Sequence, residues 1–459
     1  MKNAEKMYDT FQLGEDARCT LSMDTHATQC NNNILVVGGT GSGKTMGVAN
    51  QMLFQLQYGN AVGVFTKRGM TEDLGKILQS RGYHVYTMDL TQPEKSAFGY
   101  DPLHYCRTDA DVIALANAII HAEDKKNDLY DPFWKDSATQ ILAPVLRYVQ
   151  SGRYKKGRTM MCALELLNSI PCCDWDHADY RTYSFTDLYK HYKEDGRDWK
   201  HNPRIPTMEA QLIRFELPKL KKMDPAGGMF WDSFANGASQ TRSSIQQSLM
   251  APISKIFAPD IQKLLKAKKM FDFRTLLQPK TVLFVYTSPV NPAFHSFMSI
   301  FYLQLFKALF ELAEARKDHV LPHPVYILCD DFATGCHVPN FPEMISVFRE
   351  KQISATLLIQ SESQLAGIYG IDDAKTIINN CDTYIYLGGM DIDTSKSIAA
   401  RLNRPYPDVL AMPIAHEYFF HRGQRPVSTK RKSLYDDAAY LAAYRAVEYR
   451  LCQRFVHGG

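Results

Sequence analysis

The sequence of 459 residues predicts an α/β protein in which a mostly parallel sheet, with helices on both faces, is interrupted by an inserted all-α domain. Two observations predict this fold class. Short runs rich in β-branched and aromatic residues alternate along much of the chain with longer segments of helical periodicity. Between about residues 150 and 255, however, the sequence stays helix-prone and no strand-like run recurs. Because a chain of this length exceeds one ordinary hydrophobic core, at least two domains are expected.

The strand-like runs are nearly continuous in apolar residues, as is typical of parallel strands that are covered on both faces. They comprise residues 34–37, 61–65, 84–88, 281–286, 325–329, 355–359 and 383–387. Helical periodicity appears in DVIALANAII at 111–120 and in DSATQILAPVLRYV at 136–149. A longer amphipathic helix is expected over residues 296–317, just before the run at 325–329.

A glycine-rich turn follows the first strand-like run and precedes a helix-prone segment. Its residues match the pattern G-x-x-x-x-G-K-[ST], and they are Gly38, Gly39, Thr40, Gly41, Ser42, Gly43, Lys44 and Thr45. The glycines let backbone N–H groups wrap a polyphosphate, and the helix N-terminus adds the positive end of its dipole. Lys44 would reach the β- and γ-phosphates, and the Thr45 hydroxyl would ligate Mg²⁺. We therefore predict a site for ATP and Mg²⁺.

Two acids, Asp330 and Asp331, directly follow the apolar run at 325–329. The carboxyl edge of a parallel sheet is where α/β folds bind their ligands, so both carboxylates are expected near the phosphate loop. Asp330 would hold Mg²⁺ through water, and Asp331 would orient or deprotonate the attacking water. Standing alone, such a pair is as often a turn or a helix N-cap. The phosphate loop upstream favours the catalytic interpretation.

Charge and hydropathy leave the partners of the chain open. The net charge of +4 neither requires nor excludes nucleic acid, so any DNA-binding surface must be a local patch. Single basic clusters are usually solvated faces, but four clusters are candidates for such a patch: 153–158, 219–222, 263–269 and 422–432.

No apolar run reaches the roughly 18 residues of a transmembrane helix, and no signal peptide is evident. A cytoplasmic protein is expected.

The expected organisation has five parts. They are an N-terminal extension at 1–30, a nucleotide-binding domain in two parts at 31–127 and 256–405, a helical insertion at 128–255, and a basic, helical tail at 406–459.

The order of the motifs resembles the type IV coupling proteins of bacterial conjugation, the TraG-like branch of the FtsK/HerA family of P-loop ATPases. The resemblance covers about residues 31–405. Besides the phosphate loop it rests on FWKDSA at 133–138, SQTRSSIQQSLMAPISKIF at 239–257, PKTVLFVY at 279–286, the segment from CDDFATG to ATLLIQSESQL at 329–365, and INNCDTYIYLGGMDIDTSKSIAARL at 378–402.

The resemblance implies a RecA-like P-loop motor that works as a ring, a hexamer when active. ATP would lie between subunits, with Arg349 of the neighbouring subunit stabilising the γ-phosphate and Gln360 lying beside it. The implied function is a DNA-dependent ATPase that couples a relaxase-bound single DNA strand to a type IV secretion channel and its ATPase. It would work in the cytoplasm, recruited to the inner face of the membrane by a separate membrane protein. Two alternatives are a double-stranded DNA translocase of the FtsK/HerA type and an ATP-binding docking adapter that hardly hydrolyses ATP.

Three features depart from the family pattern. The second acid is Asp331 where the family has Glu, which shortens the reach to the attacking water by about 1.5 Å. A misplacement of this size can slow a catalytic step by about a hundredfold. Residues 65–70, FTKRGM, lack the acids that the family carries after its second strand. The family's N-terminal membrane anchor is missing, so either the chain works with a separate membrane protein or it is shortened.

Overall fold

The computed structural model describes residues 7–122, 132–154, 157–169, 229, 234, 239–334 and 337–457. Contacts divide the chain into two compact units. The sheet unit comprises Met1–Gly99, Lys125–Asn127 and Lys268–Gly459, and the helical unit comprises Tyr100–Asp124 and Asp128–Ala267. The helical unit thus starts earlier and ends later than the expected insertion at 128–255. The early start has a physical reason, because α4 (Asp109–Ile120) packs on α5 (Pro132–Gln150) within the helical unit.

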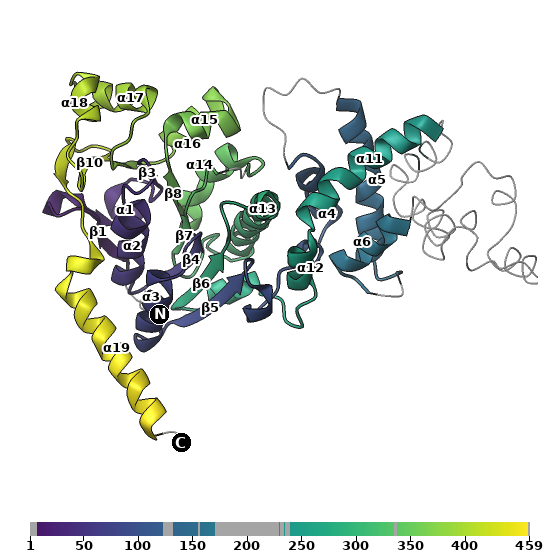
Figure 1. The fold of residues 1–459 in the computed structure, drawn as a ribbon, viewed down its shortest axis with the longest axis horizontal. Helices are drawn as coiled ribbons and strands as arrows, with labels where there is room; N and C mark the ends of the chain where they lie inside the picture. Colours follow the sequence, from purple (N-terminus) through teal and green to yellow (C-terminus); the bar gives the residue numbers. More distant parts are fainter. Residues whose placement is uncertain are drawn as a thin grey trace, which may run out of the picture. The chain divides into compact units, whose positions relative to one another are not determined.

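The sheet unit is built on a nine-stranded sheet in the order β11-β10-β9-β3-β8-β7-β4-β6-β5 (Figure 1). All neighbouring pairs from β9 to β5 are parallel, and β10 and β11 extend one edge in antiparallel fashion. The strands are β3 (Ile34–Val37), β4 (Asn60–Phe65), β5 (His84–Asp89), β6 (Thr281–Tyr286), β7 (Val325–Cys329), β8 (Ile353–Ile359), β9 (Thr383–Tyr386), β10 (His416–His421) and β11 (Val427–Lys430). The predicted α/β class and its seven parallel strands are confirmed.

Helices cover both faces of this sheet, as Figure 1 shows. On one face, α2, α3 and α19 and a small hairpin share one apolar core with the sheet. On the other face, α13 packs on α14, and α14 packs on α16. The main helices are α2 (Asn50–Gln55), α3 (Met70–Ser80), α13 (Pro292–Glu314), α14 (Phe341–Lys351), α15 (Glu362–Tyr369), α16 (Ile371–Asn379), α17 (Ile392–Leu402), α18 (Tyr406–Leu410) and α19 (Ala438–His457).

The N-terminal segment is folded into the sheet unit, although its polar sequence predicted an extension without regular structure. It forms the hairpin β1 (Thr10–Gln12) and β2 (Thr20–Ser22) and the short helix α1 (Thr25–Thr28). Asp9 anchors it, because its buried carboxylate accepts hydrogen bonds from three consecutive backbone N–H groups at 57–59 and from the Tyr326 hydroxyl. These contacts lie far apart in sequence and leave no local pattern.

The described part of the helical unit contains helices and turns. Beside α4 and α5 lie α6 (Met160–Ser169), α11 (Ser239–Ile256) and α12 (Pro259–Leu265), and α11 packs on both α4 and α5. The basic cluster at 219–222 lies outside the described residues, as do two members of the cluster at 153–158.

One described helix, Ala293–Glu314 within α13, is long and apolar enough to cross a membrane by length and composition. Of the most apolar 18 residues of this helix, 61% are buried inside the structure. Its Phe306 packs against Phe341 and Phe348 of α14, with ring centroids 5.4 and 5.1 Å apart. Burial against the sheet unit therefore accounts for its apolar composition.

The tail after residue 405 begins with the short helix α18, then adds β10 and β11 to the sheet, and ends in the helix α19. The expected helix is present as α19. The strands β10 and β11 were not expected, because the tail was predicted to be basic and helical. Glu417 of β10 is fully buried, and its carboxylate oxygens have no hydrogen-bond partner within the described residues. Burial raises the pKa of Glu417 to about 8, against a smaller lowering by Arg431.

We expect Glu417 to make stability fall as the pH rises. In the window between the ordinary pKa of about 4.5 and the folded value of about 8, the native state holds a proton that the unfolded chain has lost. Stability should therefore fall by up to roughly 1.4 kcal/mol per pH unit in this window. Glu417→Gln should flatten this dependence and raise Tm at pH 8, as measured by scanning calorimetry from pH 5 to 9. The matched variant of an exposed residue, Glu15→Gln, should keep the wild-type slope. An unchanged slope in Glu417→Gln would contradict the assignment.

Candidate functional site

Three neighbouring strands bring the predicted site residues to one edge of the sheet. In the order β3-β8-β7, the first strand leads into the glycine loop, the second into Gln360 and the third into Asp330. Since the strands are parallel, their carboxyl ends share one edge. The loop is fastened there, because Gly38 N–H donates to the Ile359 carbonyl at 3.1 Å and Gly39 N–H donates to the Gly388 carbonyl at 2.8 Å. The second anchor, which comes from the residues after β9, was not predicted.

The glycine loop has the backbone that its sequence predicts. Gly41 and Gly43 adopt φ values of 77° and 88°, which residues with a Cβ atom rarely reach. Lys44 follows, with its side chain buried, and its Nζ donates to the Gly38 carbonyl at 2.6 Å and the Gly39 carbonyl at 3.2 Å. Burial lowers the pKa of Lys44, although Asp331 and Asp330 act in the opposite direction. The loop thus holds a partly desolvated cation at its centre.

Thr45 and Asp330 meet across the site. The Thr45 hydroxyl donates to Oδ1 of Asp330 at 2.9 Å, over a sequence separation of 285 residues. Asp330 is buried, and burial together with the neighbouring Asp331 raises its pKa to about 6. A hydroxyl and a carboxylate held this close are hard oxygen ligands of the kind that Mg²⁺ takes. A buried carboxylate with a raised pKa is also one that a cation would stabilise, so these residues fit the predicted metal.

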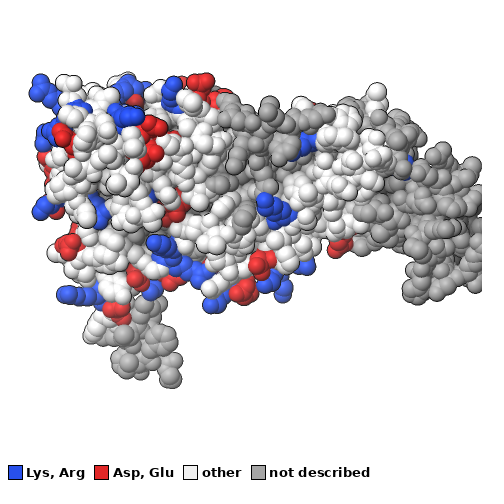
Figure 2. All heavy atoms as spheres, turned by 45° about the horizontal axis from the view of Figure 1, so that its top comes forward, with Lys and Arg blue, Asp and Glu red and all other residues white. Residues whose placement is uncertain are grey.

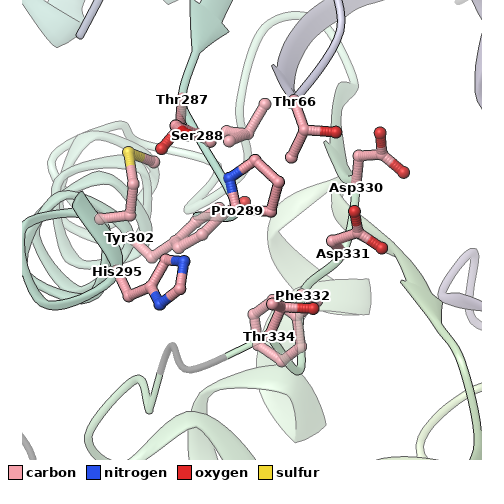
Figure 3. A pocket seen from close by; sticks show the side chains of 12 residues that line it. Thr66, Thr287, Ser288, Pro289, His295, Tyr302, Asp330, Asp331, Phe332 and Thr334 are labelled. Carbon is pink, nitrogen blue, oxygen red and sulfur yellow. The ribbon is translucent and has the colours of Figure 1, made fainter. Parts of the chain in front are cut away.

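Asp331 has an unusual backbone. Its φ of 51° lies in the left-handed region, which Asp and Asn enter far more readily than most residues with side chains. This preference favours Asp over Glu at this position. Figure 3 shows Asp330 and Asp331 on one side of a small hollow that is also lined by residues from the ends of β4 and β6 and from α13.

His295 of α13 lies on the opposite side of this hollow (Figure 3), and no pattern in the sequence indicates it. Its Nε2 atom is buried and has no hydrogen-bond partner within the described residues, and the same holds for the Thr287 hydroxyl. Burial lowers the pKa of His295, which favours a neutral imidazole. A lone His inside a long helix carries no motif, so only the fold reveals its proximity to the acids.

Gln360 and Arg349 lie at opposite ends of strand β8. Gln360 is exposed at the carboxyl end of β8, beside the start of the glycine loop. Arg349 lies near the end of α14, just before β8 begins, and it donates to the Thr25 carbonyl at 3.3 Å. The seven residues of β8 separate its two ends by roughly 20 Å. Arg349 therefore cannot reach the glycine loop of its own chain.

Three basic clusters have described members. The cluster at 263–269 begins in α12 and continues past its end, the cluster at 422–432 lies along the β10–β11 hairpin, and Arg153 and Arg158 lie between α5 and α6. Figure 2 shows Lys and Arg interspersed with Asp and Glu over the face in view. In the hairpin cluster, Arg422 pairs with Asp382 at 3.1 Å, whereas Arg431 lies directly against the glycine loop. Mixed charge of this kind does not single out a DNA-binding surface.

Comparison with known proteins assigns the chain to a family. The model of a family described as type IV secretory system, conjugative DNA transfer, matches residues 2–403. The chain therefore belongs to this family. No curated protein matches the chain.

Solved structures agree in fold. The bacterial conjugative coupling protein TrwBdeltaN70, in an unbound form, is 14% identical with a TM-score of 0.63, over 94% of this chain and 90% of that one. Plasmid coupling protein TrwB in complex with ADP and Mg²⁺ is 15% identical with a TM-score of 0.59, over 87% and 85%. VirB4 of Thermoanaerobacter pseudethanolicus is 13% identical with a TM-score of 0.52, over 94% and 98%. At these identities the likeness concerns the fold, a RecA-like P-loop domain with an all-α domain.

Proposed function

We propose that this member of the conjugative DNA transfer family is a DNA-dependent ATPase. It would act as the coupling protein that recruits a relaxase-bound single DNA strand to a type IV secretion channel and helps to drive its transfer. One observation carries the ATPase part of the proposal, namely the 2.9 Å hydrogen bond between Thr45 and Asp330 beside the buried Lys44. Residues from distant parts of the sequence would thus supply a polyphosphate cradle, a cation and magnesium ligands at the carboxyl ends of the strands. The family match over residues 2–403 supports the coupling role.

Nucleotide binding would use the backbone N–H groups of the glycine loop. Lys44 would exchange its contacts with the Gly38 and Gly39 carbonyls for the β- and γ-phosphates. Thr45 and Asp330 would hold Mg²⁺, Asp330 through water. Mg²⁺ supplies charge neutralisation on the phosphate oxygens when bound. The matches to TrwB bound to ADP and Mg²⁺, and to a non-hydrolysable ATP analogue, support this assignment.

Hydrolysis would use residues of two subunits. Asp331 orients the attacking water and accepts its proton, and Gln360 lies beside the γ-phosphate. Arg349 of the adjacent subunit stabilises charge on that phosphate, which suits its distance from the loop of its own chain. The ring is a homo-oligomer, a hexamer when active. Its further partners are the channel ATPase and a membrane protein that recruits it from the cytoplasm to the inner face of the membrane.

The short side chain of Asp331 favours one second candidate, an adapter that binds ATP to assemble but hydrolyses little of it. Turnover of ATP by the purified chain, measured with and without single-stranded DNA, separates the two functions. We expect basal hydrolysis that rises severalfold with single-stranded DNA and rises less with an equal mass of duplex. Tight nucleotide binding without DNA-stimulated turnover would favour the adapter, and stimulation by duplex alone would favour a double-stranded DNA translocase.

A further inference from the structure

Arg431, the first residue after β11, lies directly on the glycine loop. A Cβ atom built on Gly43 would be 2.1 Å from Nη1 and 2.5 Å from Cζ of Arg431, so the guanidinium packs against the bare Cα of this glycine. The contact continues along the chain. A Cβ atom on Gly47 would lie 3.5 Å from Cδ of Arg431 and from the Lys432 carbonyl, and Ser433 Oγ is 3.7 Å from the Met46 sulfur.

This contact lies on a part of the loop that is used for phosphate binding. In a loop of this type the backbone N–H groups around the last glycine cradle the α- and β-phosphates, and the lysine extends to the β- and γ-phosphates. Lys44 points to the Gly38 and Gly39 carbonyls at the start of the loop. Arg431 approaches the other end of the loop, beside Gly43 and the first helical turn.

The charge of Arg431 is available for a ligand. Within the described residues its side chain makes no ion pair or hydrogen bond, and Glu417 is an acid that interacts with it electrostatically. Burial keeps that carboxyl largely protonated at neutral pH, because its pKa is about 8. A guanidinium that is half-buried, held at a phosphate loop and not neutralised by a carboxylate is suited to bind an anion.

The backbone around Arg431 is fixed to its own sheet unit. Arg431 N–H donates to the Ala415 carbonyl at 3.0 Å, and Glu15 N–H donates to the Lys430 carbonyl at 3.0 Å. The next residue is tied as well, since Lys432 Nζ donates to Gln12 Oε1 at 3.1 Å. The N-terminal hairpin and β11 therefore position Arg431 from the same chain that supplies the glycine loop.

We propose that Arg431 binds the α- and β-phosphates of a nucleoside di- or triphosphate held by the glycine loop of its own chain. This inference rests on the proposed nucleotide site and adds a residue outside the matched family region 2–403. Arg431 binds the α- and β-phosphates, which ATP and ADP share, so it contributes to the affinity for both nucleotides. Arg349, in contrast, would act on the γ-phosphate and determine turnover.

Arg431→Gln removes the charge while keeping most of the packing. We expect it to weaken the binding of both ADP and a non-hydrolysable ATP analogue by about 10- to 100-fold, the value of one or two charged hydrogen bonds. Titration calorimetry measures this directly. KM for ATP should rise in parallel, while kcat at saturating ATP stays within about threefold of wild type. Inorganic pyrophosphate should bind less tightly to the variant as well, because the lost contact is to phosphate and not to the base.

Two further variants separate binding from structural support. Arg431→Lys should recover part of the affinity, since it keeps a charge but loses the planar fork. Arg425→Gln, an exposed arginine in the same hairpin, should bind like wild type. Unchanged affinity in Arg431→Gln, or equal losses in Arg431→Gln and Arg431→Lys, would overturn the inference while leaving the nucleotide site standing. A wild-type chain that binds neither ligand would overturn the site and the inference together.

Discussion

Lys44→Ala is expected to abolish ATP hydrolysis while the fold remains intact. The ammonium is the cation inside the glycine loop, and it makes charge-assisted hydrogen bonds that would pass to the β- and γ-phosphates. Removing one preorganised charge from a phosphoryl-transfer site costs on the order of 10²- to 10³-fold or more in kcat. Phosphate release by the purified variant, with circular dichroism as the folding check, measures this effect.

The matched control for Lys44→Ala is Lys76→Ala. Lys76 lies in α3 of the same unit and pairs with Asp73 at 3.0 Å on the surface, a contact of little energetic value. It should retain wild-type turnover. Hydrolysis at the wild-type rate in Lys44→Ala would show that residues 38–45 do not form the catalytic phosphate site.

Arg349→Ala is expected to lose turnover without losing nucleotide affinity. An arginine that completes the site from the neighbouring subunit contributes on the order of 10³-fold or more to kcat in related phosphoryl-transfer systems. Its contact is with charge that develops on the γ-phosphate, so the Kd for ADP should remain within about twofold of wild type. Single-turnover hydrolysis gives the rate of the chemical step, and ADP titration on the same preparation gives the Kd for ADP.

Arg316→Ala serves as the control for Arg349→Ala. Arg316 follows α13, is exposed and pairs with Asp318 at 3.3 Å. It should match wild type in both measurements. If Arg349→Ala hydrolyses ATP normally, or loses ADP binding in proportion to turnover, the proposed role of Arg349 in stabilising the γ-phosphate is wrong.

The parts of the fold that were predicted are those whose physics is local. β3, β6, β7 and β8 are nearly continuous apolar runs because each is buried on both faces, and this pattern is visible in one sequence. The glycine loop and Asp330 were found for the same reason, since each follows such a run directly. The hydrogen bond from Thr45 then confirms that these two predicted segments lie together.

The parts that were missed depend on long-range contacts. β1 and β2 have three residues each and are held by Asp9 and Phe11, which no periodicity marks. β10 contains the buried Glu417, although the sequence alone predicts that a glutamate lies on the surface. Arg431 belongs to a basic cluster that resembles a solvated face, and only the pairing of β10 with β11 brings it to Gly43.

In the proposed ring, two chains build each ATP site, and mixing two inactive variants distinguishes this arrangement from a site within one chain. In a head-to-tail ring formed from equal amounts of Lys44→Ala and Arg349→Ala subunits, about a quarter of the interfaces would pair an intact glycine loop with an intact arginine. ATP turnover of the mixture, measured with single-stranded DNA present to promote assembly, should therefore rise well above the sum of the two variants alone. Turnover that stays equal to that sum, and that in wild type is strictly proportional to protein concentration, would contradict a shared site.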